Sequence, residues 1–302
     1  VRTTIGTAST TATQTSRDRV NRGLFVQDIW EVNDRLHVTA SGRRDSNSDF
    51  STEDTGQLAG AWQVVESGPR LHSHIGRGIK VPTYGEIYGS TTSPGLASKP
   101  DGVRVEQSRT FDAGLEQAWG PVRADVTWFE HRYKDLVEFE STAAGNSQGG
   151  NAVARGWEFS VDADPSKRWR LHADLTVMDT NVLATKTTGT AFVVGDELLR
   201  RARLQSNASA TFRPTEDLST RLGMRYIGSR VDRNFGVSSS GLRERLGSYT
   251  LFDWAGSWTL PDPRWKLFTS AENLLDRQYS EIIGFPSPGF NAMGGVEYLH
   301  AF

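Results

Sequence analysis

The sequence predicts an all-β protein, a transmembrane antiparallel up-and-down β-barrel, on three observations. Apolar and polar residues alternate over runs of about ten residues along the whole chain, and about fourteen such runs can be placed. The connections between the runs alternate between short and long. The final run, Met293 to Phe302, carries an apolar face and ends on an aromatic residue. Outer-membrane barrels have these features, because each strand shows one face to lipid and the other to a wet interior.

The alternation is clearest in three runs in the middle of the chain, which begin at Val122, Trp157 and Trp169. Each run places large apolar side chains at every second position and polar or charged ones between them. A soluble sandwich rarely carries charges at so many consecutive positions of its second face on every strand. We therefore expect the charged positions of these runs to face the interior of a barrel: Arg123, Asp125, Glu158, Asp162, Arg170 and Asp174.

The connections predict the orientation of the strands. Every second connection of an up-and-down barrel lies on the same side of the membrane, so one side should carry short turns and the other long loops. The connection before the last run is long, which places Phe302 on the side of the short turns. Short turns are predicted at 33–35, 66–69, 120–121, 164–167, 214–216 and 261–263, and long connections at 17–22, 46–53, 80–106, 134–152, 180–199, 231–246 and 275–292.

Composition excludes several other classes of protein. No apolar run approaches the roughly 20 residues that a spanning helix needs, so a helical membrane protein is excluded. A mean hydropathy of -0.48 remains compatible with a barrel, whose strands are polar at every second position. The net charge of -2 is scattered without a basic stripe, so nucleic acid is not expected as a partner.

We find no catalytic motif and expect neither an enzyme nor a cofactor. The chain has no Gly-rich phosphate loop, no G-x-S-x-G elbow and no H-E-x-x-H pair. His72 and His74 share a strand face, but two imidazoles without a third ligand do not make a metal site. The acidic residues from Asp45 to Asp54 suit either calcium or a solvated loop, and we favour the solvated loop.

Aromatic residues on the long connections are the candidate ligand-binding residues, because they supply contact area at modest entropy cost. An aromatic girdle at the membrane interface is the alternative reading of the same residues. Three charged residues in or next to the same connections are expected to orient a ligand, and these are Glu86, Arg230 and Arg233. The aromatic candidates are Tyr84, Tyr88, Phe235, Tyr279, Phe285 and Phe290.

Several segments carry a family resemblance. The segment from Arg77 to Tyr88 resembles the strand-to-loop motif of TonB-dependent outer-membrane transporters, in which a Pro and a later Glu-apolar-Tyr open a long extracellular loop. The segment from Asn273 to Tyr279, followed by Pro288-Gly289 and a terminal Phe, is similar to the C-terminal signature of that family. Within the family, Leu198 to Ala202 and Tyr226 to Asp232 look most like the cobalamin transporter branch, although siderophore receptors share much of the same pattern.

The sequence also departs from the family pattern at several positions. Phe290 stands where an Arg usually follows Pro-Gly, which puts one contact at the periphery in question. Pro100-Asp101, then Glu106-Gln107-Ser108 and the strand from Thr110 to Gln117, look like the return of the long extracellular loop of the family. Val105 replaces the Pro expected before Glu106, and Gly102 is an extra residue in this loop. His300 occupies a position where the terminal signature prefers Tyr, which weakens recognition by the barrel-assembly machinery.

The resemblance implies a fold and a place in the cell. Family members have a barrel of about 22 strands, preceded by a plug domain and a segment that contacts TonB. Neither the plug domain nor the TonB-contacting segment is found in this sequence, so residues 1–302 are expected to be the C-terminal part of such a barrel. The edge strand from Met293 to Phe302 should then be exposed, unless these residues close into a smaller barrel. The expected location is the outer membrane of a Gram-negative bacterium, in contact with its lipid.

The resemblance also implies a function, which is active transport of a scarce, large nutrient by loop binding and TonB-driven rearrangement of the plug. Cobalamin is the first choice of ligand, and a ferric siderophore is the alternative. The implied partners are the TonB-ExbB-ExbD system, acting through the plug that the charged interior residues would contact, and the barrel-assembly machinery. That machinery would read a terminal signal formed by Val296, Tyr298 and Phe302. A passive porin or structural barrel is a competing class, and an outer-membrane enzyme is a third.

Overall fold

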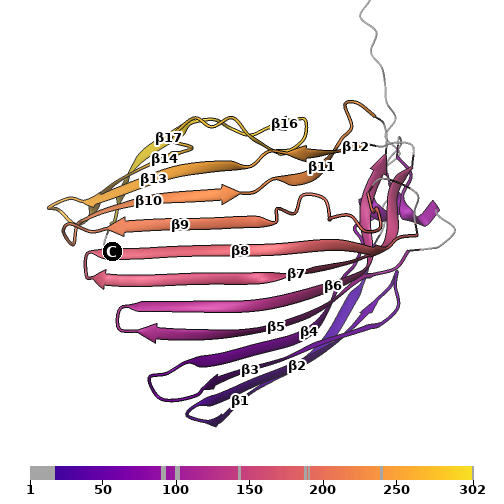
Figure 1. The fold of residues 1–302 in the computed structure, drawn as a ribbon, viewed down its shortest axis with the longest axis horizontal. Helices are drawn as coiled ribbons and strands as arrows, with labels where there is room; N and C mark the ends of the chain where they lie inside the picture. Colours follow the sequence, from indigo (N-terminus) through magenta and orange to yellow (C-terminus); the bar gives the residue numbers. More distant parts are fainter. Residues whose placement is uncertain are drawn as a thin grey trace, which may run out of the picture.

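A single large antiparallel sheet dominates the chain (Figure 1). The computed structural model describes residues 18–89, 93–98, 103–141, 144–186, 189, 191–238 and 241–300. Among these residues, thirteen strands form one sheet in which sequence neighbours pair, except where small hairpins intervene. The strands of this sheet are β1 (Asn21–Asn33), β2 (Leu36–Asn47), β3 (Glu53–Gln63), β4 (Arg70–Lys80), β5 (Glu106–Trp119), β6 (Val122–Ser141), β7 (Gly145–Ser166), β8 (Trp169–Ala184), β9 (Leu204–Phe212), β10 (Leu218–Ile227), β13 (Tyr249–Thr259), β14 (Trp265–Glu272) and β17 (Asn291–Tyr298).

The remaining elements lie in the connections. Two small hairpins interrupt the order of the sheet, one between β10 and β13 and one between β14 and β17. The sequence predicted about fourteen strands, and the described residues give thirteen in the main sheet and four in these hairpins. The additional elements are α1 (Tyr84–Tyr88), η1 (Leu96–Ser98), β11 (Arg230–Asn234), β12 (Leu242–Leu246), β15 (Ser280–Ile282) and β16 (Phe285–Pro286). Neither helical segment of the described chain is long and apolar enough to cross a bilayer.

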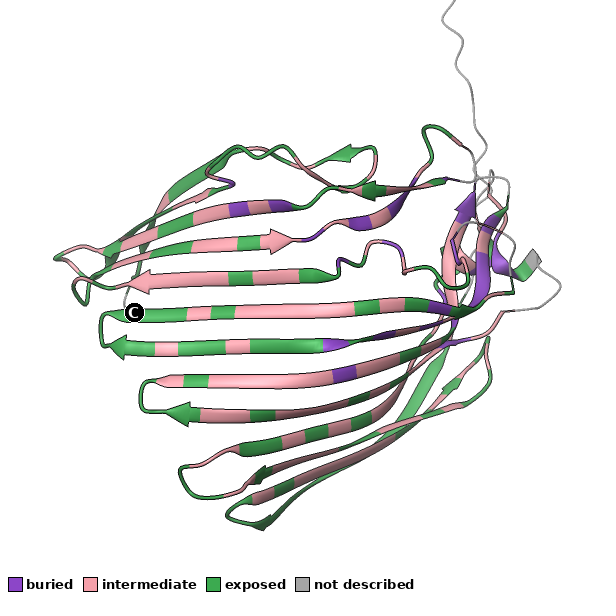
Figure 2. Cartoon of the chain, viewed as in Figure 1, coloured by how far each residue is buried: buried purple, intermediate pink, exposed green. Residues whose placement is uncertain are grey.

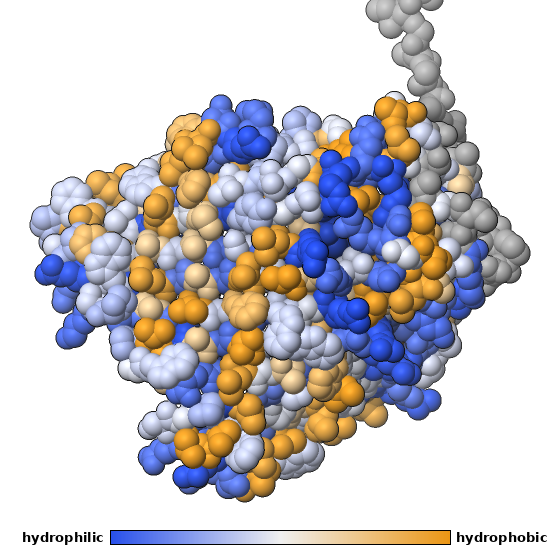
Figure 3. Space-filling view, viewed as in Figure 1, coloured by the Kyte–Doolittle hydropathy of each residue, from blue (hydrophilic) through white to orange (hydrophobic). Residues whose placement is uncertain are grey.

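The strand register confirms the two faces predicted from the alternation. Trp157 of β7 lies opposite Trp128 of β6 and Val177 of β8, so large apolar side chains form rows across one face. On the other face Ser160 lies opposite both Asp125 and Asp174. A barrel puts apolar side chains outside and polar ones inside, so we call these the outward and the inward face. Figure 3 shows the outward face, with hydrophobic atoms gathered over the middle of the strands.

The short turns lie together at one end of the sheet and the long connections at the other, as Figure 1 shows. We call these the turn end and the loop end. Trp265, the first residue after the turn at 260–264, pairs with Tyr298 at the end of β17. The last strand therefore ends at the turn end, as the loop parity predicted. Phe302 itself lies outside the described residues.

Several of the predicted long connections are corrected by the structure. The segment 180–199, for example, overlaps β8, which continues to Ala184. The segment 134–152 is not an open loop, because β6 and β7 continue through it as a hairpin that extends the sheet beyond its neighbours. Its register shifts between Tyr133 and Leu136 and again near Phe139, which interrupts the strict alternation of apolar and polar residues. The segments 17–22 and 46–53 also overlap strands, because Asn21 begins β1 and Asn47 ends β2.

Most buried residues gather toward the loop end, and a few lie on strands of the sheet, such as Phe129 of β6 and Leu251 of β13 (Figure 2). Val182, Ala191 and Phe192 form a small buried cluster, against which Leu136 and Leu198 pack. These residues come from β6, from β8 and from the connection that follows β8. The long connections therefore have a hydrophobic core of their own, above a sheet whose outward face is exposed.

Candidate ligand-binding site at the loop end

The helix α1 presents two aromatic candidates on a short, well-capped turn. Thr83 begins the helix with a capping box, in which its hydroxyl accepts from the Glu86 N–H at 3.2 Å and its own N–H donates to the Glu86 carboxylate at 2.7 Å. Tyr84 and Tyr88 are four residues apart and so share one helix face. Their rings lie 6.1 Å apart, and each residue is 39% exposed.

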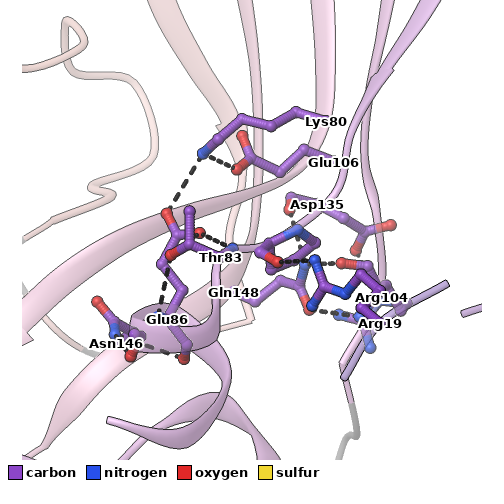
Figure 4. Close-up of polar contacts among 11 residues, drawn as sticks. Arg19, Lys80, Thr83, Glu86, Arg104, Glu106, Asp135, Asn146 and Gln148 are labelled. Atoms are coloured by element: carbon purple, nitrogen blue, oxygen red, sulfur yellow. Dashed lines mark hydrogen bonds and ion pairs between the residues drawn. The ribbon is translucent and has the colours of Figure 1, made fainter. Parts of the chain in front are cut away.

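Glu86 is engaged within the chain rather than free, as Figure 4 shows. Its second partner is Lys80 at the end of β4, whose Nζ lies 3.3 Å from Glu86 and 2.5 Å from Glu106. Burial favours the neutral acid, but the Thr83 N–H and the Lys80 ammonium outweigh that effect. The pKa of Glu86 consequently lies below its ordinary value. The carboxylate predicted to orient a ligand therefore also fixes α1 to the top of the sheet.

A second group of contacts fastens the 81–105 connection to the β6–β7 hairpin (Figure 4). Arg104 donates from Nε to Asp135 at 2.9 Å, and the Gln148 side chain bonds both the N–H and the carbonyl of Arg104. The amide of Asn146, near the tip of the hairpin, lies 3.5 Å from the carbonyls of Gly85 and Glu86. The hairpin thus holds α1 from the side.

Arg233 of β11 is almost completely buried and joins its hairpin to the tip of the β6–β7 hairpin. Its guanidinium donates to the carbonyls of Phe139 and Glu140, and lies 3.5 Å from the Glu140 carboxylate. Burial lowers the pKa of Arg233, against the opposing effect of the neighbouring glutamates. Phe235 stacks over the same guanidinium at 4.9 Å and is 40% exposed. The guanidinium therefore positions the aromatic ring of Phe235.

Arg230 connects β11 with the last long connection. It is 4% exposed, donates to the Ser280 carbonyl at 3.0 Å and lies over the ring of Tyr249. Tyr279, one of the aromatic candidates, packs against that same Tyr249 ring with 4.4 Å between centroids. Tyr279 is accordingly half-buried. It is part of the packing between β13 and the last connection.

The structure separates the predicted loop residues into two groups. Glu86, Arg230 and Arg233 have their charged groups bonded within the chain, and Tyr279 is packed. The other aromatic residues project from the loop end with large exposed fractions, and these are Tyr84, Tyr88, Phe235, Phe285 and Phe290. The first group fixes the connections in place, and the second group offers apolar surface to a ligand.

Two buried polar residues of this region were not predicted from the sequence. Asp232 is fully buried and accepts from Arg200 and from the Ile283 N–H. Asn273 is 4% exposed and adopts a φ of 50°, with its amide bonded to both the N–H and the carbonyl of Arg277. A positive φ is tolerated by Asn more readily than by most residues, so an Asn directly after a strand was an available signal for this turn.

The inward wall carries the predicted interior residues in paired arrangements. Asp125 lies 2.8 Å from His72, and His172 lies 2.8 Å from Asp162 and 3.2 Å from Asp174. Arg170 pairs with Asp164 at 3.0 Å, next to the turn. Arg123 lies opposite Asp162 in the register, and Glu158 lies opposite Thr127. These six residues share the polar face of the sheet, and their contact with a plug domain stays a prediction.

The two histidines on one strand face do not meet a third ligand. His72 contacts Asp125, and His74 lies 3.0 Å from Asp112 on the neighbouring strand. Within the described residues, no cluster of three or more His, Cys, Asp or Glu side chains could hold a metal ion. The imidazoles contribute to the polar pairing of the inward wall.

Comparison with known proteins gives a consistent family assignment. The family model described as TonB dependent receptor-like, beta-barrel, matches residues 2–274. The vitamin B12 transporter BtuB of Vibrio cholerae is 23% identical over 280 residues, which cover 89% of this chain and 41% of that protein. The iron-regulated outer membrane virulence protein of Vibrio cholerae is 21% identical over 277 residues, covering 84% of this chain and 40% of that protein.

A solved structure has the same fold. The copper transporter OprC superposes with a TM-score of 0.73 at 18% identity, covering 92% of this chain and 47% of OprC. The chain thus spans less than half the length of these relatives. The family match extends over most of the strands that form the inward and outward faces. The chain belongs to the TonB-dependent receptor family, and its residues 2–274 match the β-barrel model of that family.

Proposed function

We propose that the protein takes up a scarce, large nutrient across the outer membrane of a Gram-negative bacterium, using energy delivered by the TonB-ExbB-ExbD system. The proposed ligand is cobalamin or a related corrinoid. The observation that carries this choice is the similarity to the vitamin B12 transporter of Vibrio cholerae along 280 residues. That similarity covers strands and loops alike, so it includes the region in which a ligand would first be met.

The geometry of the loop end supports a binding role. Tyr84, Tyr88 and Phe235 expose aromatic surface on connections that buried polar contacts hold in place. Tyrosine and phenylalanine lose little side-chain entropy on binding, and fixed loops reduce the ordering cost further. A large, partly apolar ligand such as a corrinoid would bind to this surface. Phe285 and Phe290, on the last long connection, would extend it.

We assign a positioning role to Glu86, Arg230 and Arg233. Their charged groups bond to the chain itself, and two of the three are at most 4% exposed. In this proposal they keep the aromatic residues in place instead of contacting the ligand. The charged residues of the inward wall would contact the plug domain through hydrogen bonds and ion pairs.

A ferric siderophore is the alternative ligand. The similarity to an iron-regulated outer membrane protein of Vibrio cholerae, at 21% identity over 277 residues, is the observation in its favour. The exposed aromatic surface would suit an aromatic iron chelate as well as a corrinoid. Membership in the TonB-dependent receptor family speaks against the passive porin considered from the sequence.

Direct binding separates the two ligands. Full-length protein purified in detergent would be titrated with cyanocobalamin and, separately, with a panel of ferric siderophores, with tryptophan fluorescence as the readout. The proposal predicts tight binding of cyanocobalamin and none of the siderophores. Tight siderophore binding without cobalamin binding would replace the first choice by the second.

A further inference from the structure

Three arginines form a row on the outward face near the loop end. Arg77 of β4 lies opposite Arg109 of β5, which lies opposite Arg132 of β6. Arg77 and Arg109 are each two residues from an apolar outward residue, Ile75 and Phe111, which pair with each other. The row therefore begins where the apolar band of the outward face ends.

The charge in this row is only partly neutralised. Like charges directly opposite each other on neighbouring strands destabilise a sheet, so a row of three cations needs compensation. Arg77 donates to the Glu53 carboxylate at 2.8 Å, and Arg132 donates to Glu130 at 2.7 Å. Arg109 is exposed, and its side chain bonds to no other residue of the described chain.

A hollow in the outward surface lies at the same place. Its volume is about 640 Å³, and its lining includes the three arginines, Glu130, which accepts from Arg132, and the apolar residues Leu58, Ile75 and Phe111. A ligand that fits such a lining has an anionic part next to an apolar part. The lining favours an amphiphile over a simple ion.

The rest of the charged band has a different character. Figure 3 shows dark blue atoms crossing the strands between the apolar band and the loop end. On β7 and β8, however, the charges alternate in sign, because Arg155 lies opposite both Glu130 and Asp179. Arg203 then pairs with Asp179 at 3.1 Å. The excess of positive charge is thus confined to β4, β5 and β6.

We propose that Arg77, Arg109 and Arg132 bind the phosphate group of an anionic lipid in the outer leaflet of the membrane. The guanidinium groups would hold the phosphate by charge-assisted, bidentate hydrogen bonds, with Arg109 as the central donor. The acyl chains of the same lipid would lie against Ile75 and Phe111. This site is on the lipid side of the wall and is separate from the nutrient site, so it goes beyond the proposed transport function.

The test uses lipid A as the probe, in forms that differ only in phosphate. Full-length protein, delipidated in detergent, would be titrated with lipid A carrying two phosphates and with the same lipid after removal of both. The double variant Arg109→Gln and Arg132→Gln removes two donors, and Arg203→Gln is the control, an exposed arginine whose charge is paired with Asp179. Heat-dependent migration in gels verifies that each variant folds.

We expect the double variant to bind phosphorylated lipid A at least tenfold more weakly than the unchanged protein, and Arg203→Gln to bind within twofold of it. Phosphate-free lipid should bind the unchanged protein as weakly as the double variant binds the phosphorylated form. Equal binding by the double variant, or equal binding of the phosphate-free lipid, would overturn the proposal.

If inorganic phosphate competed as well as the lipid at equal concentration, the site would take an ion and the lipid proposal would fail. Should the double variant not fold, Arg109→Gln alone carries the same expectation, because that side chain has no partner among the described residues.

Discussion

The carboxylate of Asp232 accepts a hydrogen bond from Nε of Arg200 at 2.7 Å, across 32 residues of sequence. Its other oxygen accepts from the Ile283 N–H at 2.9 Å. One fully buried side chain thereby joins the connection after β8, the hairpin β11–β12 and the connection before β17. The relation explains how long connections at the loop end keep one arrangement without a large apolar core.

Replacing Asp232 by Ala should release these three connections from one another. The substitution takes the partner from Arg200, which is 34% exposed, and leaves the Ile283 N–H without its acceptor, and a lost buried hydrogen-bond partner costs about 1–3 kcal/mol. Hydrogen exchange should accelerate at residues 199–203 and 281–284, while the middle of β7 keeps its protection. Asp179→Ala, which breaks an exposed pair with Arg203, should cost less than about 1 kcal/mol. Equal effects of the two substitutions would show that Asp232 does not link the connections.

The stability of α1 should decrease at low pH, because its capping box depends on the Glu86 carboxylate. The pKa of Glu86 is lowered in the folded protein, so its stabilising contribution is complete above the ordinary value of 4.5 and is lost as the pH falls through the folded value. Hydrogen exchange at Ile87, corrected for the intrinsic rate, should therefore show less protection at pH 3 than at pH 7. Glu86→Gln should remove most of this difference. A pH dependence that survives in Glu86→Gln would assign the effect to another group.

The assignment of faces predicts opposite outcomes for two adjacent substitutions in β7. Phe159 faces outward and Ser160 inward, where it lies opposite Asp125 and Asp174. Arginine on the lipid face costs about 2–4 kcal/mol at mid-depth, whereas arginine among carboxylates on a wet wall is tolerated. Phe159→Arg should lower folding yield and stability in lipid vesicles, and Ser160→Arg should stay close to the unchanged protein. The reverse order would mean that the faces are assigned the wrong way round.

The exposed tyrosines of α1 should affect binding without affecting folding. Tyr84→Ala and Tyr88→Ala each remove aromatic surface that is 39% exposed, and we expect each to weaken cobalamin binding by about 1–3 kcal/mol. The exposed Val65, in the turn at 64–69 at the other end of the sheet, provides a control, and Val65→Ala should leave affinity unchanged. Unchanged affinity in both tyrosine variants would move the ligand site away from α1.

The strands were predictable because successive residues of a barrel strand face the lipid and the interior in turn. Trp128, Trp157 and Val177 meet on one face, and Asp125 and Asp174 occur on the other, as the alternation required. The hairpin of β6 and β7 beyond Tyr133 was missed because its register shifts, and each shift changes the face on which the following residues lie. A pattern based on strict alternation cannot follow such a segment.

The candidate site was predictable only in part. Aromatic residues on long connections could be selected by position, and five of them are exposed at the loop end. The roles of Arg230, Arg233 and Asp232 depend on partners about 30 to 95 residues away in sequence, such as Ser280, Glu140 and Arg200. A buried charge in a loop resembles a solvated one when only its neighbours in sequence are considered. Burial is a property of the folded connections, so the sequence alone could not separate positioning residues from exposed ones.

Accumulation of cobalamin in living cells would show directly whether the protein takes up a corrinoid with energy from TonB. The full-length gene would be expressed in a Gram-negative strain lacking its own cobalamin transporter, with and without a functional TonB, and uptake of radiolabelled cyanocobalamin would be measured. The account predicts accumulation in the strain with TonB and only surface-bound label in the strain without it. Equal uptake in both strains would contradict energy coupling, and absence of binding and uptake in both would contradict the corrinoid assignment.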